Sequence, residues 1–437
     1  MYCQLGALRH CLPPSVGRIL EELPETLDET YERVLREINK ANREHACRLL
    51  QCLTVALRPL RVEELAEVLA IDFNAPAHGG IPQLNPNWRW ADQHQAVLST
   101  CSSLIAIVDD GDSQVVQFSH FSVKEYLTSD RLARSSVDVS RYHIVLEPAH
   151  TILAQACLGV LLRLDDYINE DNVGDIPLVK YAAQYWVDHA QFEEVASRIR
   201  DAMEYFFDAD KPHWAAWCRV QMIDKWWWSF SPGKLQGAFP LYYASLGGFY
   251  DMAEHLVGKH PEHINARGGR MATPLVAALC GKHFEVAELL HQNGADVNVR
   301  DHREGTILRE ACRNEVLDIV QWLLNHGADV NARARGEGNW APLVVAATYG
   351  RLKAVQMLLE HDADIHVRNQ GGMTALHAAA SRSLNVHRDQ ADVMQVLLGH
   401  GAIIDAEDEM GRTPLQVALR YGNNGNATWL KEHGATR

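Results

Sequence analysis

Between residues 239 and 437 the hydrophobic and polar positions repeat in one pattern, written six times. Each copy opens with a residue followed by Leu and a short alanine-rich segment, and these first residues recur every 33 to 39 positions: Pro240, Pro274, Ile307, Pro342, Ala375 and Pro414. Pro suits the first position of a helix, because the N–H that it lacks would have no partner inside the helix. A second segment follows with apolar residues three and four apart, as at Val286, Leu289 and Leu290. This spacing predicts a helix with one apolar face, and so a series of helix pairs.

The ends of these second helices also repeat. They are predicted to finish in the left-handed conformation at Gly294, Gly327, Gly401 and Gly434, and at Asp362 in the fourth copy, because Asp adopts this conformation more readily than most residues. One copy cannot bury its own apolar face, so neighbouring copies must stack. In the last copy Asn423-Asn424-Gly425-Asn426 stands where the second helix should begin, so we expect that helix to be short. Extra residues at 381–388 make the fifth copy a candidate for partner specificity.

A column of histidines precedes the residues that end the helices, and consists of His326, His361, His400 and His433. Stacked helices lie about 10 Å apart, too far for these imidazoles to share one metal ion at about 2.1 Å. We therefore expect them to cap helix-end carbonyls. No metal site and no cofactor are predicted.

The copies resemble ankyrin repeats. Thr374-Ala375-Leu376-His377 is close to the T-P-L-H-x-A pattern of that family, and Gly294-Ala295-Asp296 has its turn sequence. The resemblance implies a solenoid of about six repeats, whose inter-repeat turns project as fingers beside a concave face of inner helices. It also implies a protein partner there, contacted by Arg270, Met271, Arg300, His302, Arg335, Asn339, Trp340, Arg368, Gln370, Met373, His377, Met410 and Arg412.

Two features of these fingers allow alternatives. Trp340 and Met410 are large apolar side chains at positions that should face water, so they are candidate anchors, although Trp340 could instead pack on its neighbour. The arginines of one column are either a basic edge for an acidic peptide or part of the scaffold, and Glu407 interrupts them: Arg267, Arg300, Arg333 and Arg368.

The first 135 residues have a different pattern. Thr26 and Glu29 form a capping box, followed by apolar residues at the spacing of one helix face: Leu27, Tyr31, Val34, Leu35 and Ile38. Further helices are predicted at 46–57 and 62–70.

A hairpin is predicted where segments 103–108 and 114–118 flank a turn that contains Gly111. Three helices and a hairpin predict a winged-helix domain over residues 1–135. Its helix 62–70 is a poor reader of DNA, because Glu63, Glu64 and Glu67 would be repelled by phosphates.

Ser119, His120 and Ser122 follow the hairpin directly. Ser122 and Glu125 predict a second capping box that begins a helix. The alternative is a hydrolase in which His120 acts with Ser119 or Ser122. A nucleophilic pair also needs a group that orients the His and an oxyanion site, and nothing in the sequence indicates either.

Residues 140–238 are predicted to form a helical connector domain before the repeats. Helices are expected at 148–164, 177–189, 192–207 and 212–226. Tryptophans crowd its end, and we expect them to be core residues that cover the first repeat: Trp214, Trp217, Trp226, Trp227 and Trp228.

A second resemblance covers the amino-terminal part. Leu23–Leu35, Pro59–Ala66 and Phe118–Leu127 resemble the winged-helix region that follows the NACHT nucleotide-binding module in fungal NOD-like receptors, and Tyr181–His189 resembles a connector helix of the same proteins. The resemblance implies the order ATPase switch, winged helix, repeats. The phosphate loop G-x-x-x-x-G-K-[ST] is absent from the 437 residues, so the nucleotide switch is not carried over. We expect a truncated relative, or a predicted gene that begins too late.

Composition narrows the choice of partner and compartment. A net charge of −15 disfavours nucleic acid, whose binding depends on Lys and Arg. No apolar run approaches the length of a membrane helix, and no signal sequence is evident. Nine cysteines without a C-x-x-C pair are expected to be reduced thiols. We expect a cytoplasmic protein, monomeric as this chain.

Together these patterns predict a mostly α protein that carries a winged-helix domain, a helical connector and an ankyrin solenoid. The expected function is a non-enzymatic protein–protein interaction module, the sensor or scaffold part of a NOD-like receptor. A role in non-self recognition or signalling rests on the resemblance alone. The alternatives are a hydrolase and a winged-helix DNA-binding regulator.

Overall fold

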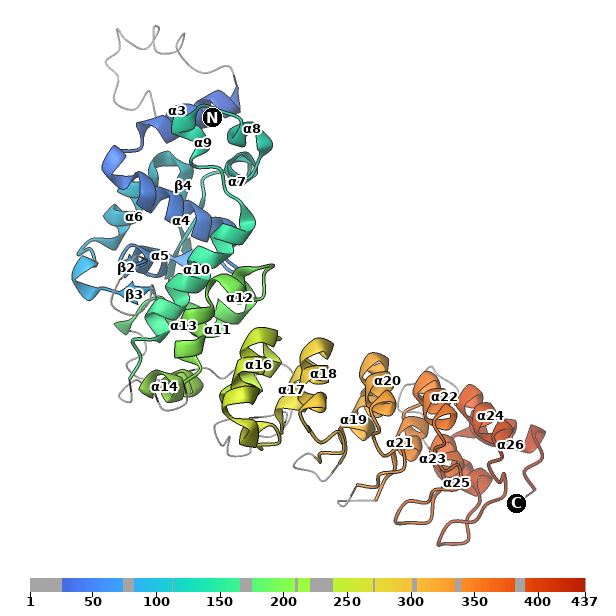
Figure 1. Cartoon of the computed structure of the whole chain (residues 1–437). Helices are drawn as coiled ribbons and strands as arrows, with labels where there is room; N and C mark the ends of the chain where they lie inside the picture. Colours follow the sequence, from blue (N-terminus) through green and yellow to red (C-terminus); the bar gives the residue numbers. More distant parts are fainter. Residues whose placement is uncertain are drawn as a thin grey trace. The chain divides into compact units, whose positions relative to one another are not determined.

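The computed structural model describes residues 26–73, 82–111, 113–165, 175–208, 211–220, 239–269, 272–300, 305–334, 339–381 and 390–436. The chain folds as two compact units, Met1–Ser231 and Pro232–Arg437, coloured blue to green and yellow to red in Figure 1. The division proposed at residue 140 lies inside the first unit. The proposed start of the repeats at residue 239 lies close to the boundary between the units.

The first unit opens with α3 (Leu27–Glu37), and its predicted capping box is present. The N–H of Glu29 donates to Oγ1 of Thr26 at 3.2 Å, and the N–H of Thr26 donates to a carboxylate oxygen of Glu29 at 3.3 Å. The elements that follow are η2 (Lys40–Asn42), α4 (Arg43–Val55), β1 (Leu60–Arg61), α5 (Val62–Val68), β2 (Ile71–Asp72), β3 (Gln83–Leu84), η4 (Pro86–Trp88), α6 (Gln93–Cys101), η5 (Ser102–Leu104), β4 (Ile105–Asp110), β5 (Ser113–Phe118), α7 (Phe121–Leu127), α8 (Asp130–Ala133) and α9 (Val137–Ser140).

The predicted hairpin is β4 and β5, which pair antiparallel. Strand β1 adds to β5, with Leu60 opposite Val116, so that the sheet has the order β1-β5-β4. Helix α5 follows β1 directly and completes a winged-helix arrangement. Neither the two-residue β1 nor α6 was predicted, because β1 is too short to show alternation and α6 buries small residues, Ala96 and Thr100 among them.

The rest of the first unit is helical. Helix α10 (Leu146–Leu161) is its buried centre and packs against both α4 and α11 (Val179–Ala190). The prediction of a single helix at 192–207 is wrong. The chain forms two helices there, α12 (Val195–Arg198) and α13 (Arg200–Phe206). Ile199, with φ −109° and ψ 16°, separates them. Helix α14 (Pro212–Val220) follows.

An aromatic core joins these helices. The Trp214 and Trp217 ring centroids are 5.3 Å apart, and Trp217 stands edge-on to Phe206 at 5.2 Å and to Trp186 at 6.1 Å. Trp186 and Trp217 have no exposed surface. The two tryptophans of α14 are core residues as predicted, and these contacts lie within the first unit. Coverage of the first repeat by these tryptophans stays a prediction. Trp226, Trp227 and Trp228 lie outside the described residues.

The second unit is the predicted array of six helix pairs, which follow one another in chain order in Figure 1. Inner helices of successive repeats contact each other, as α21 does α23 and α23 does α25. The pairs are α15 (Pro240–Leu246) with α16 (Tyr250–Lys259), α17 (Pro274–Cys280) with α18 (Phe284–Gln292), α19 (Ile307–Asn314) with α20 (Leu317–Asn325), α21 (Pro342–Thr348) with α22 (Leu352–Glu360), α23 (Ala375–Ser381) with α24 (Ala391–Gly399), and α25 (Pro414–Arg420) with α26 (Asn424–Glu432).

The last helix corrects one prediction. Helix α26 has nine residues, as α24 has, and is not short. One of its asparagines bonds to the preceding repeat: buried Asn426 donates its amide N–H to the carbonyl oxygen of Ala379 at 3.2 Å. Of the extra residues predicted at 381–388 in the fifth repeat, Ser381 ends α23, and the others lie outside the described residues.

Candidate protein-binding surface

The fingers before α23 and α25 are tight loops, each closed by one side chain. Oδ1 of Asp408 accepts hydrogen bonds from the N–H groups of Met410 and Arg412 at 2.8 and 2.9 Å. Asn369 closes the preceding finger in the same way, and the N–H of Glu409 donates to that finger at 3.1 Å. The two fingers are therefore fixed internally and tied to each other.

The tips of these fingers carry the exposed candidates. Met410 is 74% exposed, and Gln370 is exposed at the corresponding tip. Met373, at the base of the earlier finger, is half-buried. Met410 is thus an apolar side chain in water on a fixed loop, as predicted for an anchor.

Trp340 has the other of its two proposed roles. Its ring is half-buried and packs against the cluster of Ala341, Val344, Val367 and Ala378, so it joins one repeat to the next. Asn339 beside it has φ +48°, which suits the turn. This part of the finger is scaffold.

The arginine column is also used by the scaffold. Nη1 of Arg300 donates to the carbonyl oxygen of Arg333 at 2.8 Å, and Nη1 of Arg368 donates to that of Glu407 at 2.7 Å. In both cases an arginine bonds the backbone at the same position of the next finger. The guanidinium groups of Arg300 and Arg368 thus hold neighbouring fingers together, as the scaffold alternative predicts.

His377 was predicted to contact a partner, and this is wrong. Its side chain has no exposed surface. Nδ1 lies 2.9 Å from Oγ1 of Thr374, and Nε2 lies 2.9 Å from the carbonyl oxygen of Arg412. The imidazole therefore anchors a finger from within. The guanidinium of Arg412 is held by Asp408, with Nη2 and Oδ2 2.6 Å apart.

Four predicted contact residues lie outside the described residues: Arg270, Met271, His302 and Arg335.

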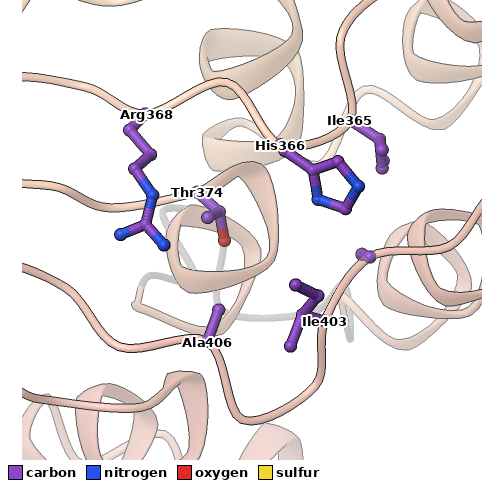
Figure 2. A pocket seen from close by; sticks show the side chains of 7 residues that line it. Ile365, His366, Arg368, Thr374, Ile403 and Ala406 are labelled. Atoms are coloured by element: carbon purple, nitrogen blue, oxygen red, sulfur yellow. The ribbon is translucent and has the colours of Figure 1, made fainter.

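A small pocket lies beside these fingers, with a volume of about 140 Å³. Figure 2 shows Arg368 and Thr374 on one side of it, and Ile365, His366 and Ile403 on the others. Pockets for small-molecule ligands measure about 300–1,000 Å³, so this one has the size for a single side chain. It was not predicted, because its walls come from two consecutive repeats.

The histidine column caps helix ends, as predicted. Each Nδ1 lies 2.6 to 2.9 Å from the carbonyl oxygen four residues earlier: Trp322 for His326, Met357 for His361, Val396 for His400 and Trp429 for His433. The predicted left-handed helix ends are present too, and Asp362 has φ +62°.

Another histidine cluster was missed. His260, Glu262 and His263 place three ligand atoms within 4.8 Å of one another. Its signal in the sequence is His260-Pro261-Glu262-His263, which departs from the repeated histidine column.

In the first unit, Ser122 and His120 are in contact. Nδ1 of His120 lies 2.6 Å from Oγ of Ser122, which is also 2.7 Å from the hydroxyl of Tyr31. The predicted Ser122 cap is wrong: His120 is the N-cap of α7 and accepts from the N–H of Ser122 at 3.3 Å. In the part of the chain that the structure describes, no carboxylate contacts the His120 ring.

The carboxylates of α5 are placed differently from the prediction. Glu64 and Glu67 do not face solvent but are 0% and 2% exposed. Glu64 is paired with Arg58 at 2.7 Å and Arg61 at 3.2 Å, and Glu67 is paired with Arg89. The predicted repulsion of phosphates by these two carboxylates therefore does not apply, because both are buried and paired with arginines.

The described cysteine side chains are free thiols. Free thiols are present at Cys47, Cys52, Cys101, Cys157, Cys280 and Cys312, and burial raises the pKa of Cys47 to about 11 and of Cys52 to about 12. These thiols are poorly ionised at neutral pH.

Among the helices of the described ranges, none combines the length and apolar character needed to cross a bilayer.

The geometry defines a winged-helix domain followed by ankyrin repeats, and two family models agree. The model described as ankyrin repeats (3 copies) matches residues 275–369 and 343–436. The model described as the winged helix domain of GPI inositol-deacylase matches residues 31–138. Both kinds of domain are therefore present.

Relatives match parts of the chain. The azaphilone pigments biosynthesis cluster protein L of Monascus ruber is 31% identical over 296 residues, 63% of this chain and 61% of that protein. Alpha-latrocrustotoxin-Lt1a of Latrodectus tredecimguttatus is 40% identical over 63 residues, 14% of this chain and 4% of the toxin. The chain thus spans less than two-thirds of either relative. A crystal structure of an ankyrin repeat domain from Acinetobacter baumannii is 27% identical, covers 45% of this chain and 98% of its own, and has a TM-score of 0.39.

Proposed function

We propose that this chain is a non-enzymatic module that binds a protein partner at the finger tips before α23 and α25. Met410 carries the proposal: an apolar side chain, 74% exposed, on a loop closed by Asp408. Ankyrin repeats are protein-interaction modules, and this family matches the second unit.

The physical argument concerns the cost of binding. Association costs free energy when flexible loops must be ordered. The finger around Met410 is already ordered by Asp408 and by its bond to the preceding finger. A partner that covers Met410 therefore gains from apolar burial while it orders little.

The proposal is tested by binding to the immobilised chain. The parent, Met410→Ala and Tyr421→Ala are each purified and immobilised, and the proteins that bind to each are identified in parallel. Tyr421 is 62% exposed in the loop after α25, so it is a matched control away from the finger tips. A partner retained by the parent and by Tyr421→Ala, with affinity for Met410→Ala reduced by about 2 kcal/mol or more, supports the proposal. A partner that binds Met410→Ala as tightly as the parent contradicts the proposal.

We also propose that the chain serves as the sensor or scaffold part of a NOD-like receptor, in the cytoplasm and as a monomer. The support is the resemblance of three segments of the first unit, together with a fungal relative that matches 63% of the chain. Sequencing of transcripts upstream of Met1 tests this: an in-frame phosphate loop supports it. The relative's name places that protein in a pigment cluster, and a role in such a cluster is a second setting for the same binding function.

A hydrolase remains the alternative class, because the Ser122 and His120 side chains touch. The local geometry favours capping: Nδ1 of His120 also accepts the N–H of Ser122. Ester turnover by the purified chain that disappears in Ser122→Ala would favour an enzyme. A salt-dependent gel shift of duplex DNA would favour the regulator.

A further inference from the structure

The first repeat departs from the others at the end of its second helix. Where the third repeat has His326-Gly327-Ala328-Asp329, the first has His260-Pro261-Glu262-His263. The Gly turn is replaced by the 3-10 helix η8 (Pro261–His263), which turns three polar side chains toward one another.

The distances within this cluster suit a metal ion. Nδ1 of His260 lies 3.2 Å from Oε1 of Glu262, and Nε2 of His263 lies 3.9 Å from the same oxygen. The three ligand atoms all lie within 4.8 Å of one another. Around a tetrahedral zinc ion with bonds of about 2.0–2.1 Å, neighbouring ligand atoms are about 3.4 Å apart. The pair of His260 and Glu262 is close to this spacing at 3.2 Å, and the pair of His263 and Glu262 is longer at 3.9 Å.

The two imidazoles are held in place by stacking. The His263 ring lies on Phe239, with centroids 3.9 Å apart and an interplanar angle of 23°, and on His260 at 5.1 Å and 21°. The His263 side chain is only 17% exposed. Pro261 restricts the backbone between the histidines. The site is therefore partly preorganised, which lowers the cost of binding.

We propose that His260, Glu262 and His263 bind one divalent transition-metal ion, with zinc as the ion that this ligand set fits. Two imidazole nitrogens and one carboxylate oxygen are a common zinc ligand set, and solvent completes the coordination. The proposal departs from the prediction of no metal, which considered only the repeated histidine column.

The ion would tie the end of α16 to the start of the following finger. In a stacked array each repeat depends on its neighbours, and terminal repeats have fewer of them. A bound ion would therefore stabilise the first repeat more than the others.

Calorimetric titration of the full chain with zinc chloride tests the site. We expect one equivalent to bind, with affinity reduced at least about tenfold in His260→Ala/His263→Ala, since loss of even an outer partner costs about 10- to 100-fold. Glu262→Gln should weaken zinc binding, because it removes the charge of the carboxylate and leaves the shape of the side chain almost unchanged. His361→Ala/His400→Ala, which removes two capping histidines, is the matched control. It should bind zinc at the His260, Glu262 and His263 site as the parent does.

A spectroscopic readout separates the site from loose surface binding. Cobalt should give visible absorption bands of a tetrahedral site in the parent and the control, and not in His260→Ala/His263→Ala. Circular dichroism confirms that each variant is folded. Zinc affinity equal in the parent and in His260→Ala/His263→Ala, or no binding to the parent, overturns the proposal.

Discussion

At the scale of the residue, Glu64 shows how a buried charge is kept in the first unit. Its side chain has no exposed surface, and Arg58 donates to both of its oxygens at 2.7 Å. Burial by itself raises the pKa of Glu64, but the hydrogen bonds from Arg58 and the N–H of Arg61 outweigh it, and the pKa is lowered. Its contribution to stability is therefore present above its ordinary pKa of 4.5 and is lost as the pH falls through the lower folded value.

Replacement of Arg58 should show what the pair holds. Arg58→Ala leaves a buried carboxylate with one partner fewer, and we expect a loss of about 3–5 kcal/mol in the free energy of unfolding at pH 7. The loss should be smaller at pH 4, because Glu64 in the Arg58→Ala variant can then take a proton and is no longer a buried charge. Urea unfolding at the two pH values measures both effects.

The matched control is Arg36→Ala, which removes an exposed i,i+4 pair with Glu32 and should cost less than about 1 kcal/mol. Equal losses in the two variants would contradict the assignment.

His189 is a second buried titratable group. It is 0% exposed, with Nε2 2.8 Å from the hydroxyl of Tyr181 and Nδ1 2.8 Å from Nδ1 of His150. Burial, and then the charge of His150, lowers the pKa of His189 from 6.5 to about 3. The unfolded chain therefore binds a proton between these values that the folded chain does not, so stability falls as the pH drops from 6.5 toward 3.

His189→Gln removes this proton uptake. We expect the variant to lose less stability on acidification, by up to about 1.4 kcal/mol per pH unit below pH 6. Urea unfolding at pH 7, 6 and 5 gives the slopes. His94→Gln, which changes an exposed histidine of α6, is the matched control, and equal slopes in the parent and in His189→Gln would refute the linkage.

At the scale of the element, the second helices of repeats two to six end in left-handed backbone. Four of these ends are Gly, with φ from +81° to +99°, and the fourth repeat has Asp362 at φ +62°. An L side chain is strained there and Gly is not.

Exchange of the two residue types should therefore have opposite effects. Asp362→Gly should stabilise the array by about 0.5–1 kcal/mol, and Gly327→Asp should destabilise it by a similar amount. No heavy atom lies within 4 Å of a Cβ built at Gly327, so only the backbone is tested. Unfolding in urea measures both, and changes of the same sign would contradict the account.

At the scale of the whole molecule, each unit has a core of its own. The first contains the aromatic cluster around Trp186, and the second is built from contacts between neighbouring repeats. A defect in one core should therefore stay in its unit.

Trp186→Ala tests this independence. Trp186 has no exposed surface, so its truncation should cost the first unit about 3–5 kcal/mol. Hydrogen exchange read by mass spectrometry should show weaker protection of α10 and α11, and unchanged protection of α21 to α26. Loss of protection in both units would mean that they unfold together.

The helix pairs, their left-handed ends and the β4–β5 hairpin were predictable, because each is specified by residues that are neighbours along the chain. The break at Ile199 and the full length of α26 were not, because packing against other helices outweighs local preference. Among the predicted partner residues, Met410 is exposed as expected, whereas His377 is buried by contacts with the next finger.

The sequence by itself determined that this protein has six stacked repeats behind a winged helix, because periodic apolar faces can be buried in few ways. Only the tertiary structure decided which polar side chains are free. Glu67 meets Arg89 and Tyr31 meets Ser122 across 22 and 91 positions, and Arg368 reaches the next finger. Whether a charge or hydroxyl faces solvent or the scaffold depends on such distant contacts, and no local pattern encodes them.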